Sequence, residues 1–209
     1  MKASVLKTGD KRSESRNDKS LGIQTYGECN DYPQRCKEIS NASGTARSCL
    51  KIYAKFIAGC GFADSVFYNA QANRYSHTND YLLSQIARDY ADYGGFALHV
   101  NYNGLCQIVE VQHVPFETIR IEKLDDYGEF YRVATHPDWG RRNQALRRFR
   151  KEDMRFFYLF DPDPCTVQLQ VEESGGWESY AGQIYYYSEA GEKTYPSPIF
   201  DPVLTDMST

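Results

Sequence analysis

The sequence lacks the short motifs that mark the commonest enzyme active sites. It contains no Walker loop, no Gly-x-Ser-x-Gly and no His-Glu-x-x-His. Cys-x-x-Cys pairs are also missing, and the four histidines stand apart in the chain, so a structural zinc site is disfavoured. We therefore expect a protein that is not an enzyme and that has no catalytic residues, no metal and no cofactor.

Long apolar runs are missing as well. No stretch approaches the roughly 20 apolar residues that a membrane-spanning helix needs, and the first residues lack the apolar core of a signal peptide. The six cysteines are irregularly spaced, and several fall inside predicted helices or strands. These features favour free thiols in a reducing compartment over a disulfide framework, and they predict no membrane partner.

Tyrosine, by contrast, is abundant. The chain has 17 Tyr among 209 residues, and aromatic residues make up 14% of it. Such a content favours β-rich structure or interfaces, where Tyr buries its ring and keeps its hydroxyl hydrogen-bonded. The length allows one domain with a sizeable core. The net charge of −4 argues against a generic nucleic-acid binder.

Residues 78–114 predict a helix followed by two paired strands. Apolar residues first recur at three- and four-residue steps, between a capping threonine and a terminating Gly94. The period changes to two over residues 96–102, as in a half-buried strand. Asn103-Gly104 then predicts a tight primed turn, after which residues 105–114 return as the second strand.

The remaining chain predicts two early helices and a series of strands. Residues 1–20 are polar and predict a flexible N-terminal arm. One short helix is predicted from Pro33, and a longer one follows a capping segment at residues 41–45. Later strands are predicted at residues 118–123, 130–134, 156–160, 166–171 and 182–188. This order predicts an α+β fold with a mostly antiparallel, meandering sheet over residues 21–209.

Three features are open to a functional interpretation, and a plainer one is favoured for each. Gly59-Cys60-Gly61 follows a helix and lacks the third glycine of a nucleotide fingerprint, so a helix end is favoured. His99 and His113 could each meet a Cys or Asp in space, although a structural or solvated role is favoured. Asp161 and Asp163 could bind a hard cation weakly, but a turn that ends a strand is favoured.

One segment is conspicuous for its charge. Residues 141–155 hold seven basic and two acidic side chains, although the whole chain is negatively charged. Such a run can contact phosphates, an acidic partner surface or a neighbouring subunit, and it can equally be a solvated face. The candidate contact residues for DNA or a partner are Arg141, Arg142, Arg147, Arg148, Arg150, Lys151 and Arg155.

A series of short motifs also runs along the chain. Tyr-Gly-Glu-Cys-Asn-Asp-Tyr-Pro at residues 26–33 is followed by Ser-Gly-Thr at 43–45 and Ile-Ala-Gly-Cys-Gly-Phe at 57–62. Later motifs are Asp-Tyr-Gly-Gly-Phe (92–96), Val-Gln-His-Val-Pro-Phe (111–116), Asp-Trp (138–139), Phe-Asp-Pro-Asp (160–163), Gly-Gln-Ile-Tyr-Tyr-Tyr (182–187) and Tyr-Pro-Ser-Pro-Ile-Phe-Asp-Pro-Val (195–203). In this order, over residues 24–205, the chain resembles the N-terminal part of portal proteins of tailed bacteriophages. The resemblance is greatest to those of Bacteroidetes phages and prophages.

The resemblance implies a structural subunit without catalytic residues. Portal proteins form a dodecameric ring at one capsid vertex, and DNA is packaged and ejected through that ring. The implied partners are other portal subunits, the major capsid protein, the large terminase subunit, a head–tail adaptor and the double-stranded DNA in the channel. The implied location is the virion, and the bacterial host cytoplasm during assembly. Residues 21–209 would correspond to part of the wing, truncated before the stem, clip and crown.

Two alternative functions remain open from the residues. The chain could be a small nucleic-acid-binding module that uses residues 141–155, in which case its affinity should fall steeply with salt. It could also be a metal-dependent nucleic-acid-processing enzyme whose acids and histidines converge only in three dimensions.

Overall fold

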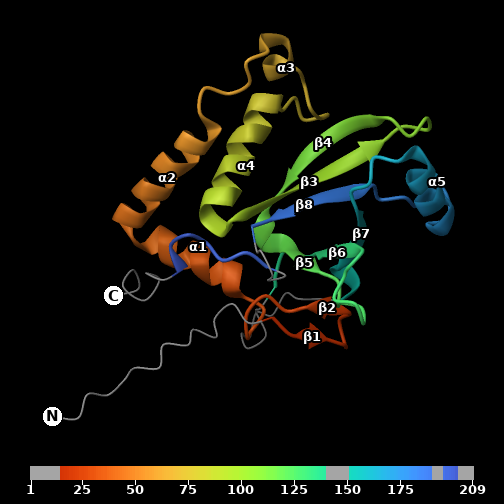
Figure 1. Cartoon of the computed structure of the whole chain (residues 1–209), viewed down its shortest axis with the longest axis horizontal. Helices are drawn as coiled ribbons and strands as arrows, with labels where there is room; N and C mark the ends of the chain where they lie inside the picture. Colours follow the sequence, from red (N-terminus) through yellow and green to blue (C-terminus); the bar gives the residue numbers. More distant parts are fainter. Residues whose placement is uncertain (1–14, 140–150, 190–194, 202–209) are drawn as a thin grey trace.

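The structure, a computed structural model, describes residues 15–139, 151–189 and 195–201 (Figure 1). Within these ranges the chain has the predicted α+β fold, in which helices pack around a mostly antiparallel six-stranded sheet. The described helices are α1 (Tyr32–Ala42), α2 (Gly44–Ala58), α3 (Ser65–Asn69), α4 (Asn79–Tyr93) and α5 (Pro164–Glu173). Figure 1 shows α2 and α4 side by side at one end of the sheet and α5 at the other.

The sheet has the strand order β4-β3-β8-β7-β6-β5. Its neighbouring strands are antiparallel except for β7 and β8, which are parallel because α5 connects them as a crossover. A small separate pair, β1 with β2, lies near β5. The strands are β1 (Asn17–Asp18), β2 (Ile23–Gln24), β3 (Gly95–Tyr102), β4 (Ile108–Val114), β5 (Ile119–Ile121), β6 (Arg132–Thr135), β7 (Arg155–Leu159) and β8 (Gln183–Ser188).

The start and end of α4 and the start of β3 follow from particular residues. The Thr78 hydroxyl caps α4 by accepting a hydrogen bond from the Tyr81 N–H. Gly94 ends the helix at a φ of 76°, a left-handed conformation that glycine adopts at low cost. At Gly95, an added Cβ would lie 2.6 Å from the Tyr187 carbonyl oxygen of β8. β3 therefore lies too close to β8 and to the Phe116 ring at this point for any side chain.

One predicted strand is wrong, because residues 166–171 lie inside the helix α5. The Asp163 carboxylate accepts from the Cys165 N–H as the N-cap, and Pro164 occupies the first turn, where its missing N–H costs nothing. Val167 and Val171 are both buried, four residues apart. A six-residue alternation of apolar and polar side chains also fits one helix face at this spacing, so the capping Asp-Pro pair decides the outcome.

The hairpin between β3 and β4 also differs from its prediction. Asn103-Gly104 does not form a two-residue primed turn. Instead, the Asn103 side-chain oxygen accepts from the Leu105 and Gln107 N–H groups, and Cys106 takes the positive φ of 58°. The loop is therefore wider, and β4 begins at Ile108 rather than at residue 105.

Two further predictions need correction. The predicted arm at residues 1–20 lies outside the described residues up to residue 14, but Asn17–Asp18 forms β1 and pairs with β2. A second expectation from the sequence, that Tyr185, Tyr186, Tyr187 and Phe200 form one exposed aromatic patch, is also wrong. Tyr186 and Phe200 belong to the main core, whereas the other two are partly exposed. Alternate residues of β8 point to opposite faces of the sheet, so three consecutive tyrosines do not share one surface.

Arg120 of β5 is fully buried. Its five N–H groups all have acceptors: both Asn30 oxygens, the Gln34 side-chain oxygen, and the backbone carbonyls of Glu117 and Ile119. Tyr26 and Trp139 add cation–π contacts, with the guanidinium carbon 5.6 and 5.2 Å from their ring centroids. Burial lowers the pKa of Arg120 to about 10, so it stays charged at neutral pH. We call these residues, Arg120 with Tyr26, Asn30, Gln34 and Trp139, the Arg120 cluster.

The C-terminal segment closes over this cluster. The Tyr195 ring stacks on Tyr26 with ring centroids 4.1 Å apart. Its hydroxyl donates to the Gln24 carbonyl and accepts from the Ile121 N–H, at 2.8 Å each. The Tyr26 hydroxyl donates in turn to the Pro196 carbonyl. Segments far apart in the sequence, around residues 26, 120, 139 and 195, are thus joined through one charged group.

Because the cluster is buried and fully hydrogen-bonded, replacing Arg120 should be costly. We expect Arg120→Lys to lower the free energy of unfolding by about 3 kcal/mol, since lysine retains the charge but loses two of the five donors and the planar fork. Urea denaturation followed by circular dichroism measures this. The matched control is Arg132→Lys on β6, because the Arg132 side chain is 44% exposed where it pairs with Glu122. This substitution should cost less than about 1 kcal/mol. Equal losses in the two variants would contradict the proposed role of Arg120.

Candidate functional site

The structure describes only part of the predicted basic segment. Lys151 begins the short 3-10 helix η3 (Lys151–Asp153) and donates a hydrogen bond to the Ser20 carbonyl. Arg155 is exposed at the start of β7, opposite Thr135 of β6. The other five basic candidates, Arg141, Arg142, Arg147, Arg148 and Arg150, lie outside the described residues. Contact of this segment with DNA or a partner stays a prediction.

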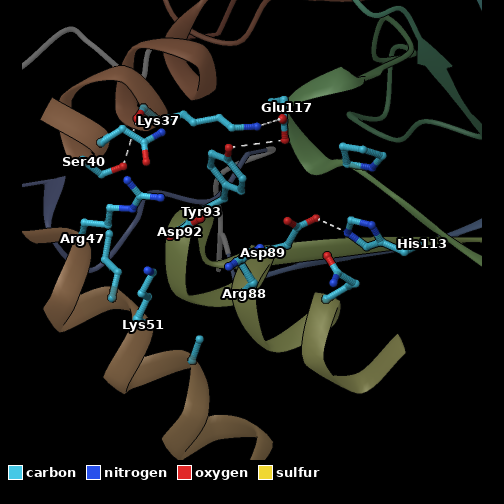
Figure 2. A pocket seen from close by; sticks show the side chains of 15 residues that line it. Lys37, Ser40, Arg47, Lys51, Arg88, Asp89, Asp92, Tyr93, His113 and Glu117 are labelled. Atoms are coloured by element: carbon cyan, nitrogen blue, oxygen red, sulfur yellow. Dashed lines mark hydrogen bonds and ion pairs between the residues drawn. The ribbon is translucent and has the colours of Figure 1, made fainter. Parts of the chain in front are cut away.

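A different set of charged residues surrounds a cavity of about 350 Å³ between α1, α2 and α4 (Figure 2). We call it the helix pocket. Four residues of α2 line it at steps of three and one, namely Arg47, Leu50, Lys51 and Ala54. Residues of α4 at the same helical spacing line the facing side, namely Gln85, Arg88, Asp89 and Asp92. Residues at these spacings share one helix face, so two helices lying side by side create the pocket.

Two of the acids of the helix pocket already have partners within the protein. Asp89 is buried, and its carboxylate accepts from His113 Nε2 of β4 at 2.7 Å and from the Phe116 N–H at 3.1 Å. Glu117 accepts hydrogen bonds from Lys37 of α1 and from the Tyr93 hydroxyl. These pairs form the floor of the pocket, so both carboxyl groups already have partners there. Burial nevertheless raises the pKa of Asp89, because it outweighs the opposing effect of His113.

The remaining charged residues of the pocket have fewer charged partners. Arg47, Lys51 and Arg88 are exposed, and none of them takes part in an ion pair within 4 Å among the described residues. Asp92 is partly buried one helical turn after Arg88. Burial and the charge of Asp89 raise the pKa of Asp92 to about 6, while Arg88 and Lys37 act in the opposite direction. The rim of the pocket is therefore cationic, with one carboxyl group that titrates near neutral pH.

A second unusual surface lies on the outer side of α2. This 15-residue helix has no fully buried residue, although it packs beside α4. Ile52 is 68% exposed and Phe56 is 82% exposed, one turn apart on the same face. Further along the chain Phe62, Val66 and Phe67 are exposed as well, and the rings of Phe62 and Phe67 touch edge to face. We call Ile52, Phe56, Phe62, Val66 and Phe67 the α2–α3 apolar surface.

Within residues 15–139, 151–189 and 195–201, no group of three or more His, Cys, Asp or Glu side chains is arranged to hold a metal ion. No disulfide forms among the six cysteines, all of which lie in the described part of the chain. Of the helices in that part, none has the length and apolarity to cross a bilayer. Asp161 and Asp163 lie in the turn before α5, where Asp163 serves as its cap.

The sequence was also compared with known proteins. No family model matches it, and no match is found among curated proteins.

Sequence reasoning missed both surfaces. Arg47 and Lys51, and likewise Arg88 and Asp92, are spaced four residues apart within predicted helices, which would have placed each pair on one face. The sequence does not show that these two faces lie opposite each other, because that depends on how α2 packs on α4. The exposure of Ile52 and Phe56 could not be predicted for a similar reason. Apolar residues on every side of a helix are typical of a buried helix.

The raised pKa of Asp92 predicts a pH dependence of stability. An unfolded Asp titrates near pH 4, so between about pH 4 and pH 6 the folded state binds the proton more strongly than the unfolded state does. The wild-type protein should therefore lose stability as the pH rises through this range. Asp92→Asn removes this loss and should be more stable than wild type by about 1 kcal/mol at pH 7, with no difference near pH 4.

Thermal unfolding of both proteins between pH 4 and pH 8 checks this expectation. Asp126→Asn, in an exposed turn, is the matched control and should follow the wild-type curve. A constant difference between Asp92→Asn and wild type at all pH values would mean that Asp92 does not titrate in this range.

Proposed function

We propose that this chain is a structural assembly subunit, namely the wing-type region of a tailed-phage portal protein. Its role would be to form, with other portal subunits, the ring at one capsid vertex through which DNA is packaged and ejected. Under this proposal it works in the virion, after assembly in the host cytoplasm. Its partners would be the major capsid protein, the large terminase subunit, a head–tail adaptor and the DNA in the channel.

The observation that carries the proposal is the α2–α3 apolar surface. Subunit interfaces bury large apolar side chains such as these, including Ile52 and Phe56, which share one helix face. Burial of one Phe or Ile side chain contributes about 1.5–3 kcal/mol, so covering Ile52 and Phe56 alone favours association substantially. The helix that carries them projects to the side of the sheet, where a neighbouring molecule can approach (Figure 1).

The ordered motifs give the second support. Three of them contribute to the Arg120 cluster and its cover: residues 26–33 supply Tyr26 and Asn30, residues 138–139 supply Trp139, and the last motif supplies Tyr195 and Pro196. These three motifs therefore contribute to a packed, hydrogen-bonded core. That is the expected pattern when a chain resembles a family of structural subunits and shares no catalytic residues with it.

The genomic position of the gene tests the portal assignment independently of any biochemistry. A portal gene is expected next to a gene for a large terminase subunit, within a cluster of phage head genes. A neighbourhood without phage structural genes would argue against the assignment, and would favour one of the two alternatives, a nucleic-acid-binding module or a nucleic-acid-processing enzyme.

Self-association through the α2–α3 apolar surface can be measured directly. We expect the wild-type chain to associate in a concentration-dependent way, and Phe56→Lys to weaken that association by at least about tenfold, because it places a charge in the contact. Analytical ultracentrifugation over a concentration series checks both expectations. Phe56 is already exposed, so the variant should fold normally.

The matched control is Tyr127→Lys, since Tyr127 is even more exposed but lies in the turn before β6, far along the chain from α2. This control should associate like wild type. A wild-type chain that stays monomeric at every concentration, or an equal effect of both substitutions, would refute the role of this surface.

A further inference from the structure

The helix pocket has the features of a ligand site that the assembly role does not require. Its volume of about 350 Å³ lies within the range of small-molecule sites, roughly 300–1,000 Å³. It is recessed between three helices, and all of its lining residues belong to the described part of the chain. Figure 2 shows Arg47 and Lys51 extending from α2 into the space that Arg88 and Asp92 border on α4.

The charges of the pocket are arranged in two layers. At the floor, Asp89 and Glu117 already accept hydrogen bonds from His113, Lys37 and Tyr93. At the rim, Arg47, Lys51 and Arg88 form no ion pair within 4 Å in the described residues. Three positive groups that converge on one concave space repel one another, and this repulsion is relieved when an anion enters.

We propose that the helix pocket binds a small phosphate-bearing ligand through Arg47, Lys51 and Arg88. Guanidinium groups donate paired hydrogen bonds that match the oxygens of a phosphate, and a lysine adds a point charge. The amide side chains of Asn41 and Gln85 also line the cavity and supply neutral donors.

Within the described residues, Asp92 forms no hydrogen bond or ion pair with another side chain of the pocket. Arg88 and Lys37 act on it only through their charges. Its pKa of about 6 makes it partly protonated in mildly acidic solution, and a protonated carboxyl group donates a hydrogen bond to a phosphate oxygen.

The recess also decides between ligand classes. The phosphates of a DNA duplex lie on a wide convex surface, whereas this pocket accommodates a compact anion between its helices.

Calorimetric titration of the full chain with inorganic pyrophosphate at low ionic strength tests the proposal. We expect one site per chain, and Arg88→Gln and Lys51→Gln should each weaken binding by at least about tenfold. The matched control is Lys55→Gln, which is exposed on the same helix as Lys51 but does not line the pocket. Its affinity should stay within about twofold of wild type, because it changes the net charge equally without touching the ligand.

Two further titrations identify the source of the phosphate. If a nucleoside triphosphate binds at least about tenfold more tightly than inorganic triphosphate, the ligand is a nucleotide; equal affinities mean that the phosphate groups alone are recognised. The proposal fails if wild type shows no binding at about 1 mM pyrophosphate, or if Lys55→Gln weakens binding as much as Lys51→Gln does. It also fails if a DNA duplex binds more tightly than pyrophosphate and is weakened by all three substitutions alike.

These results are independent of the assembly proposal. Lys51 and Arg88 are not part of the α2–α3 apolar surface, so loss of phosphate binding should leave self-association unchanged. Loss of self-association in Phe56→Lys should likewise leave pyrophosphate binding intact.

Discussion

A single buried positive charge, that of Arg120, joins segments of this protein that are far apart in the sequence. Removing a guanidinium from water costs several kcal/mol unless every one of its donors is paired. Arg120 meets that condition with oxygens from α1, from the loop before it and from the turn that begins β5. The energetic requirement is therefore also a geometric one, because these segments have to meet at one point for the charge to be tolerated.

This requirement explains the unusual tyrosine content. Tyr26, Tyr32 and Tyr195 are buried around the cluster, and each also uses its hydroxyl to bind another segment. Tyr26 and Tyr195 stack on each other, and Tyr32 donates to Asp201 near the end of the described chain. An aliphatic core of the same size would bury the same area but would not connect these backbone segments. The core is thus specified by hydrogen bonds as well as by shape.

The sequence predicted those parts of the fold that depend on local signals. The boundaries of α4 follow from Thr78 and Gly94, and the change of period at Gly95 marks the start of β3. The helix α5 was predicted as a strand because six alternating residues fit both periods, and only Asp163 and Pro164 distinguish them. The burial of Arg120 was not predicted, since it lies between two isoleucines of β5 and alternation within a strand does not reveal that the opposite face is also covered.

The candidate sites were less predictable than the fold, for the same reason. The basic segment was visible because its residues are consecutive, yet five of its seven basic residues lie outside the described structure. The helix pocket and the α2–α3 apolar surface depend on the packing of α2 against α4, which single-helix patterns do not determine. In both cases the residues are typical helix residues in the sequence. Only the packing of the helices shows which side chains lie opposite them or remain exposed.

Hydrogen exchange tests most directly the central claim that the Arg120 cluster and its cover form one cooperative unit. The informative protons are the Tyr26 N–H, bound to the Asn30 side chain, the Ile121 N–H, bound to the Tyr195 hydroxyl, and the Trp139 indole N–H, bound to the Thr118 carbonyl. We predict that all three exchange only through global unfolding, with the same free energy as the central amides of β3. Exchange of any of them through a local opening at least about 2 kcal/mol easier than global unfolding would contradict the claim.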